Sequence, residues 1–121
     1  MTADYSAYSA YAKSHSSALK GRAVEGEALM KAARMLDQAR TSPADTGAFL
    51  EALKFSHKLW TIFQADLSDP DNPLPSKTRK ELLELSLFMD REIAASLQAR
   101  SEKSLQAMID INRTLASALF P

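Results

Sequence analysis

Few residues of this chain have the types and spacing that enzymatic or metal chemistry requires. The 121 residues include two histidines, His15 and His57, and no cysteine. His57 precedes the only tryptophan, Trp60, by one helical turn, a position more typical of a partly covered helix residue than of a general base or a ligand. No H-x-x-E, E-x-x-H or HExxH spacing occurs. The sequence therefore predicts no zinc or di-iron site, no cofactor and no enzymatic activity.

An acidic run over residues 66–72 has the composition of a calcium loop but not its spacing. Carboxylate and amide oxygens, the ligands that Ca²⁺ prefers, come from Asp66, Asp69, Asp71 and Asn72. The run lacks the glycine and the downstream glutamate of an EF-hand loop, and prolines interrupt it. We therefore interpret it as a turn. The sequence also contains no glycine-rich phosphate loop.

A small basic cluster, Lys77, Arg79 and Lys80, is the one pattern that suggests nucleic acid. The chain has 15 basic and 15 acidic residues, so its formal net charge is zero. RNA binding needs a wider basic surface and aromatic residues placed to stack on bases, whereas the aromatic residues here fall in apolar stripes. We interpret the cluster as a solvated start of a helix, with RNA contact as the minor alternative.

Hydrophobic periodicity predicts an all-α protein, a small four-helix bundle-like domain in which no segment alternates like a strand. The predicted helices span about residues 22–40, 47–67, 76–98 and 102–120. No apolar run exceeds three residues, far fewer than the 20 or so that a membrane span needs. The N-terminus has no secretory signal features. We therefore expect a soluble, cytoplasmic protein with no membrane partner.

The segments between the predicted helices contain turn-forming and helix-capping residues. Residues 41–47 are rich in turn formers, and Asp45 or Thr46 can cap the helix that follows. Ser76 and Ser101 are natural N-caps for the third and fourth helices.

The stretch 59–75, LWTIFQADLSDPDNPLP, organises the predicted fold. Trp60 and Phe63 share one helical face. Three prolines then make a stiff corner, because each removes a backbone donor and restricts the preceding residue. We expect Trp60 and Phe63 to lie in the core more readily than in an interface, and Leu74 and Pro75 to pack inside the corner.

The N-terminal segment, residues 1–20, is expected to be flexible or short-helical, ahead of a helical core over residues 21–120 in a single domain (1–121). Gly21 interrupts the helical pattern at this boundary. Tyr5, Tyr8 and Tyr11 recur every three residues, which would place them along one side of a short helix. Two interpretations stay open: a frayed terminus, or a segment that contacts a partner or the groove of its own domain.

Two of the predicted helices carry more large apolar side chains than one inward face requires. In helix 47–67 they form two stripes, the first made of Phe49, Leu53, Trp60, Phe63 and Leu67 and the second of Phe55, Leu59 and Ile62. In helix 76–98 the stripe of Leu82, Leu85, Met89, Ile93 and Leu97 is broadened by Leu83, Leu87 and Phe88. This surplus indicates binding to a partner protein through helices.

The last helix carries one polar residue on its apolar seam. Asn112 lies between Met108 and Leu115, where another apolar residue is expected. It either fixes the register or the choice of partner, at a cost in stability, or sits at the rim and satisfies a loop carbonyl. Arg113, its neighbour, is placed to reach a helix C-terminus or an acidic partner.

Three stretches, taken together and in order, are similar to one known family. They are residues 58–75, 82–93 and 108–119. The Leu-Trp pair, the Phe three residues after the Trp, and Asn-Pro-Leu-Pro (72–75) resemble the pattern of the FlaF family of bacterial flagellar biosynthesis regulators. Ile-Asn-Arg (111–113) resembles it too, and the similarity covers essentially the full length. The chain departs from the family at residues 85–88, where Leu-Ser-Leu-Phe replaces a Leu-Gly-Phe pattern.

The resemblance implies a cytoplasmic, non-enzymatic secretion chaperone that binds flagellin and supports flagellin synthesis, export and filament assembly. The implied partners are flagellin, through its amphipathic terminal helices, and FlbT, a regulator of flagellin messenger RNA translation. The alternative is a post-transcriptional regulator that contacts this messenger RNA directly or through FlbT. The sequence leaves the oligomeric state open. Residues predicted to contact the partner are Tyr5, Tyr8, Tyr11, Leu59, Trp60, Phe63, Leu74, Phe88, Asn112 and Arg113.

Overall fold

Four helices joined by short turns make up the described part of the chain. The computed structural model describes the backbone of residues 19–119 and the side chains of residues 25–117. The helices are α2 (Leu19–Thr41), α3 (Thr46–Ser68), α4 (Ser76–Gln98) and α5 (Glu102–Leu119). No strand occurs among these residues, and the prediction of a small all-α bundle is confirmed.

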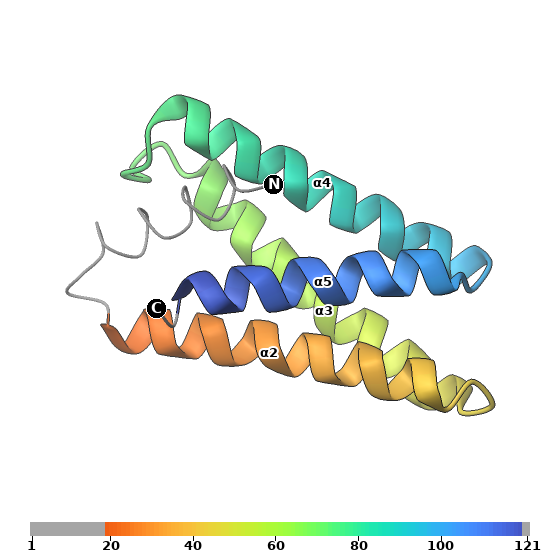
Figure 1. The fold of residues 1–121 in the computed structure, drawn as a ribbon. Coiled ribbons are helices and arrows are strands. Elements are labelled where there is room, and N and C mark those ends of the chain that lie inside the picture. Colours follow the sequence, from red (N-terminus) through yellow and green to blue (C-terminus); the bar gives the residue numbers. More distant parts are fainter. Residues whose placement is uncertain (1–18, 120–121) are drawn as a thin grey trace.

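The first and last of these helices form the closest pair in the bundle. α2 and α5 lie side by side and antiparallel (Figure 1), and they share the most extensive helix–helix contact in the fold. α3 packs against α2 and against α4, whereas α4 touches α5 only slightly. Fully buried alanines on both helices, Ala32 and Ala33 on α2 and Ala116 on α5, leave room for a close approach. α4 therefore depends mainly on α3 for its packing.

Two of the predicted helix caps are present. The Asp45 carboxylate accepts a hydrogen bond from the backbone N–H of Ala48 at 2.9 Å and so caps α3. The hydroxyl of Ser101 accepts from the N–H of Ser104 at 3.3 Å, at the start of α5. In both cases a side-chain oxygen satisfies a donor that the first turn of a helix leaves without a partner.

Two predicted helix starts are wrong. Pro75, not Ser76, is the N-cap of α4; its φ of −56° and ψ of 146° end the extended segment, and its carbonyl accepts the N–H of Arg79. The stiff proline sets this boundary, so Ser76 is already helical. Gly21 lies inside α2, which begins at Leu19. A glycine costs a helix only about 1 kcal/mol relative to alanine, and tertiary packing commonly outweighs such a preference.

The proline corner, residues 69–75, is held by the side chain of Asn72 as well as by its prolines. Asn72 Nδ2 donates to the carbonyl of Asp66 at 3.0 Å, and Asn72 Oδ1 accepts the N–H of Leu74 at 3.0 Å. These two hydrogen bonds turn the side chain of Leu74 inward, where it is buried. The corner therefore joins α3 to α4 in one defined geometry.

Most of the predicted core residues are buried together in one cluster. Three exceptions stand out. Ile62, on the second predicted stripe of α3, and Leu97, in the predicted stripe of α4, are both 57 % exposed, and Leu87, which broadens that stripe of α4, is 51 % exposed. Leu97 lies at the end of α4, which α5 barely contacts, so no described helix covers it. Ile62 likewise projects from a side of α3 that neither neighbour covers.

Candidate partner-binding surface

In the described part of the chain, the side chains that the sequence singles out for chemistry are exposed or make structural hydrogen bonds. His57 is exposed on α3. No group of three or more His, Asp or Glu side chains among the described residues is placed to hold a metal ion. Asp69 Oδ1 accepts the N–H of Asp71 at 2.9 Å, so this carboxylate shapes the turn. In the basic cluster, Arg79 Nη1 donates to the carbonyl of Asp69 at 3.1 Å.

Four apolar residues predicted to contact a partner lie inside the bundle. Trp60 and Phe63 are buried and meet edge to face, with ring centroids 5.4 Å apart and planes at 89°. Leu59 and Leu74 are buried as well. The structure thus gives these side chains a role in the core, as expected for Trp60 and Phe63, while their contact with a partner remains a prediction.

Asn112 is completely buried and is bonded to the core tryptophan. Trp60 Nε1 donates a hydrogen bond to Asn112 Oδ1 at 2.9 Å. Asn112 Nδ2 is also buried and has no hydrogen-bond partner among the described residues. The interpretation that places Asn112 at the rim is therefore wrong. The residue lies on the interior seam, where its bond to Trp60 fixes how α5 sits relative to α3.

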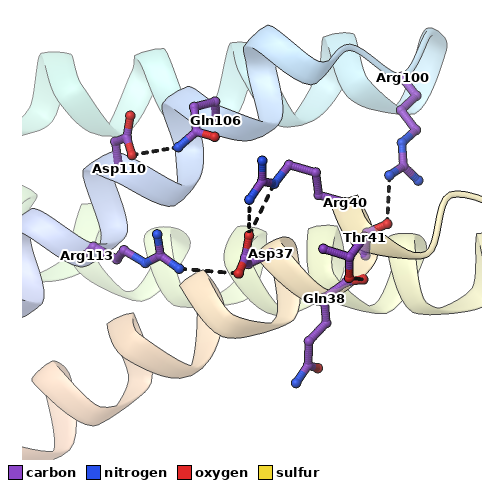
Figure 2. A network of polar contacts seen from close by, with 9 residues as sticks. Asp37, Gln38, Arg40, Thr41, Arg100, Gln106, Asp110 and Arg113 are labelled. Carbon is purple, nitrogen blue, oxygen red and sulfur yellow. Dashed lines mark hydrogen bonds and ion pairs between the residues drawn. The ribbon is translucent and has the colours of Figure 1, made fainter.

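Arg113 reaches an acidic group of its own chain. Its Nη2 lies 3.4 Å from Asp37 Oδ2, and Arg40 binds Oδ1 of the same carboxylate, so the network joins α2 to α5 (Figure 2). The hydrogen bond from Arg40, with the positive charges of both arginines, lowers the pKa of Asp37 below its ordinary value of 3.8. The same contact raises the pKa of Arg40. This network lies on the surface and stabilises the pairing of α2 with α5.

The remaining predicted contact residues are at the margin of the core or outside the described residues. Phe88 is half-buried and packs against the core cluster. Tyr5, Tyr8 and Tyr11 lie outside the described residues. Their role in contacting a partner therefore stays a prediction.

Exposed apolar side chains gather at one place that the predicted contact set did not include. Among the described residues, four large apolar side chains are strongly exposed: Leu50, Ile62, Leu87 and Leu97. Two of these four, Leu50 on α3 and Leu97 on α4, line the same groove. We call it the α3–α4 groove; its volume is about 270 Å³ and its lining residues are Leu50, Leu53, Lys54, His57, Asp90, Ile93, Ala94 and Leu97.

A hydrogen bond joins α3 to α4 at Asp90, one of the residues that line the α3–α4 groove. Gln64 Nε2 on α3 donates to Asp90 Oδ2 on α4 at 2.7 Å. The other carboxylate oxygen, Asp90 Oδ1, is buried and has no hydrogen-bond partner among the described residues. A buried carboxylate oxygen in this state favours a donor, because leaving it unpaired costs free energy. The groove therefore offers mainly aliphatic contacts, together with the exposed side chains of Lys54 and His57.

Sequence reasoning missed this groove for an identifiable reason. Leu50 lies outside both apolar stripes predicted for its helix. A leucine at such a position indicates an apolar side chain that the core does not cover. Leu97 was assigned to the core stripe of α4, because periodicity indicates which residues share a face without indicating whether another helix covers it.

The geometry defines a class of protein: a small all-α bundle with a compact core and an exposed apolar groove between two helices. The chain belongs to the FlaF family, since the family model described as flagellar protein FlaF matches residues 7–119. It is therefore a flagellar protein. No curated protein and no solved structure matches the chain. In the described part of the chain, no helix is both long and apolar enough to cross a membrane.

Proposed function

We propose that this protein is a cytoplasmic chaperone that binds flagellin and supports its synthesis, export and assembly into the filament. The proposal starts from membership in a flagellar protein family. The observation that carries it further is the α3–α4 groove, which two strongly exposed leucines line. An unpartnered apolar groove between helices is a common binding site for an amphipathic helix.

A chaperone for export must bind its client and then release it. The α3–α4 groove is about 270 Å³, so one helix face would bury a modest area there. Interfaces of small area are typical of transient complexes. A compact bundle with a limited docking surface thus suits reversible covering of a flagellin helix that would otherwise associate with other flagellin chains.

Isothermal titration of the purified full chain with purified flagellin tests this proposal directly. We expect a one-to-one complex with a Kd in the micromolar range or below. The measurement is repeated with FlbT present, because FlbT is the second candidate partner. Absence of binding heat in the titration, and of co-elution of the two proteins in gel filtration, under both conditions would overturn the proposal.

A gel shift with the flagellin messenger RNA leader at several salt concentrations is the matched test for the alternative function. If the chain binds this RNA directly, the affinity should fall steeply as the salt concentration rises.

The tyrosine-containing N-terminal segment is a second contact region in this proposal. Deleting residues 1–14 is expected to leave the melting temperature nearly unchanged and to weaken flagellin binding. The control is a chain of full length in which Tyr5, Tyr8 and Tyr11 are replaced by serine. A large fall in melting temperature with binding preserved would show that the segment serves the fold instead.

A further inference from the structure

We propose that α4 opens and refolds as a unit of its own while α2, α3 and α5 remain packed together. The inference concerns the stability of one helix relative to the others, so it does not depend on the proposed function. Three separate features of α4 support it: the helices that it packs against, the groups at its two ends, and the polar atoms that it buries.

α4 is the helix whose opening would disturb the rest of the bundle least. α2 packs against both α3 and α5, and the hydrogen bond from Trp60 to Asn112 joins α3 to α5 directly. α4, by contrast, packs mainly against α3 and touches α5 only slightly. Figure 1 shows it at the edge of the bundle, on the side away from α2. The contacts that hold α2, α3 and α5 together therefore do not pass through α4.

The chain is long enough for α4 to unfold without moving its neighbours. α4 has 23 residues, which rise about 34 Å as a helix. The same residues can span about 75 Å when they are extended. An unfolded α4 can therefore still bridge the end of α3 and the start of α5. Partial opening of a contiguous segment of this kind is common in folded proteins.

Both ends of α4 lack the groups that stabilise helix termini. Its N-cap, Pro75, makes no side-chain hydrogen bond, and its first turn contains no acidic residue but contains Lys77, whose charge opposes the helix dipole. Its last turn contains no basic residue. Each of the other helices has at least one such group: Asp45 caps α3, Glu102 begins α5, and Arg40 is in the last turn of α2. α4 is therefore the helix that its own termini stabilise least.

Buried polar atoms on α4 favour its opening further. Asp90 Oδ1 and Ser96 Oγ are buried and have no hydrogen-bond partner among the described residues. Unfolding of α4 would expose both atoms to water, which supplies the missing hydrogen bonds. The closed state still dominates, because α4 also buries large apolar side chains. These are Leu82, Leu85, Met89 and Ile93.

Native-state hydrogen exchange of the full chain, followed by NMR, tests the inference. The slowest amides of α2 and α5 should exchange only when the whole protein unfolds. We expect the amides of α4 to exchange at least about tenfold faster than these, relative to their intrinsic rates, because the opening of α4 is sufficient for them. Equal protection of the slowest amides in α2, α4 and α5 would overturn the inference.

A matched pair of surface variants gives a sharper test. Ser76 and Glu102 are the exposed first residues of α4 and α5. An acidic residue at this position stabilises a helix, so Ser76→Glu should slow exchange and Glu102→Ser should speed it, each about two- to fivefold. α4 is unfolded in both the opened and the fully unfolded state, so Ser76→Glu should change exchange in α2, α4 and α5 alike. α5 is unfolded only in the fully unfolded state, so Glu102→Ser should change exchange in α2 and α5 and leave α4 unchanged.

A second pair acts in the core and decides if the surface changes prove too small to measure. Ile93→Val on α4 and Ile109→Val on α5 each remove one buried methyl group, and should speed exchange about two- to tenfold in the same two patterns. If the α5 variants change exchange in α4 as much as in α2 and α5, the inference is wrong, because α4 then unfolds only with the whole protein. No partner takes part in these measurements, so this result would leave the proposed function standing.

Discussion

Trp60 and Asn112 are 52 residues apart, and a buried hydrogen bond of 2.9 Å joins them across the core. Trp60 is on α3 and Asn112 on α5, two helices that otherwise share little contact. The indole is long enough to reach from one helix to the other, and its N–H requires an acceptor once buried. The pair therefore sets the position of α5 relative to α3, with α2 packed against both helices.

Breaking this pair from either side should destabilise the fold. Trp60→Phe leaves Asn112 Oδ1 buried and unpaired, and Asn112→Leu leaves Trp60 Nε1 in the same state. We expect each change to lower the free energy of unfolding by about 1–3 kcal/mol through the hydrogen bond alone. The double variant should lose less than the sum of the two, with a coupling of about 1 kcal/mol. Urea unfolding followed by circular dichroism measures all four proteins.

A second cycle controls for packing. Phe63 touches the Trp60 ring, and its side chain has no N–H or O–H that could take the place of the Trp60 donor, so Phe63→Leu combined with Asn112→Leu should be additive within about 0.5 kcal/mol. Equal coupling in both cycles would mean that general repacking, not the hydrogen bond, links these positions.

The fold was predictable where local chemistry decides it. Asp45, as a helix cap, predicts the turn around residues 42–45, and the prolines predict the corner at 69–75. The periodic apolar residues predict the four helices. Trp60 and Phe63 were expected in the core and are there. These features depend on restricted backbone angles and on the spacing of apolar residues. Both are determined by residues that are close together in the sequence.

The candidate site was not predictable in the same way. Leu97 and Ile62 have the spacing of buried residues, yet both are exposed because no described helix covers their sides of α4 and α3. Asp90, which lines the groove, is bonded to Gln64, a residue 26 positions away. Such features arise from how the helices are placed in space, and a periodic pattern carries no information about that placement.

The proline corner should depend on Asn72 in addition to its prolines. Asn72→Ala removes the bond to the Asp66 carbonyl and the bond from the Leu74 N–H, and we expect a loss of about 1 kcal/mol because the site is partly exposed. Asn72→Asp keeps the acceptor for Leu74 but turns a carboxylate oxygen toward the Asp66 carbonyl, so it should lose at least as much. Thermal unfolding of the two variants and of the natural protein measures these losses of stability. Stability equal to the natural protein in both would mean that the prolines alone hold the corner.

Arg100 should stabilise the end of the bundle where two turns meet. Its Nη2 donates to the carbonyl of Ala39 at 2.7 Å, and its guanidinium lies 4.7 Å from the centroid of the Phe49 ring. Arg100, in the turn before α5, thus contacts the end of α2 (Figure 2) and also the Phe49 ring near the start of α3. Arg100→Lys keeps the charge but loses the planar group, and we expect a loss of about 1 kcal/mol. Arg100→Ala should lose more. Urea midpoints of both variants, compared with Arg91→Lys on exposed α4 surface, measure the difference.

The pairing of α2 with α5 should weaken in acid through Asp37. Its pKa is lowered in the folded protein by Arg40 and Arg113, so folding favours the charged carboxylate. The stabilisation is complete above the ordinary pKa of 3.8 and is lost as the pH falls through the lower folded value. Asp37→Asn removes this contribution at every pH. The natural protein should therefore melt at a higher temperature than Asp37→Asn at neutral pH, and the two melting temperatures should converge below pH 3.8. Asp71→Asn, at an exposed position in the proline corner, is the control and should not reproduce the convergence. A difference between Asp37→Asn and the natural protein that stays constant from neutral pH into acid would contradict the prediction, because it would assign the effect to shape and not to charge.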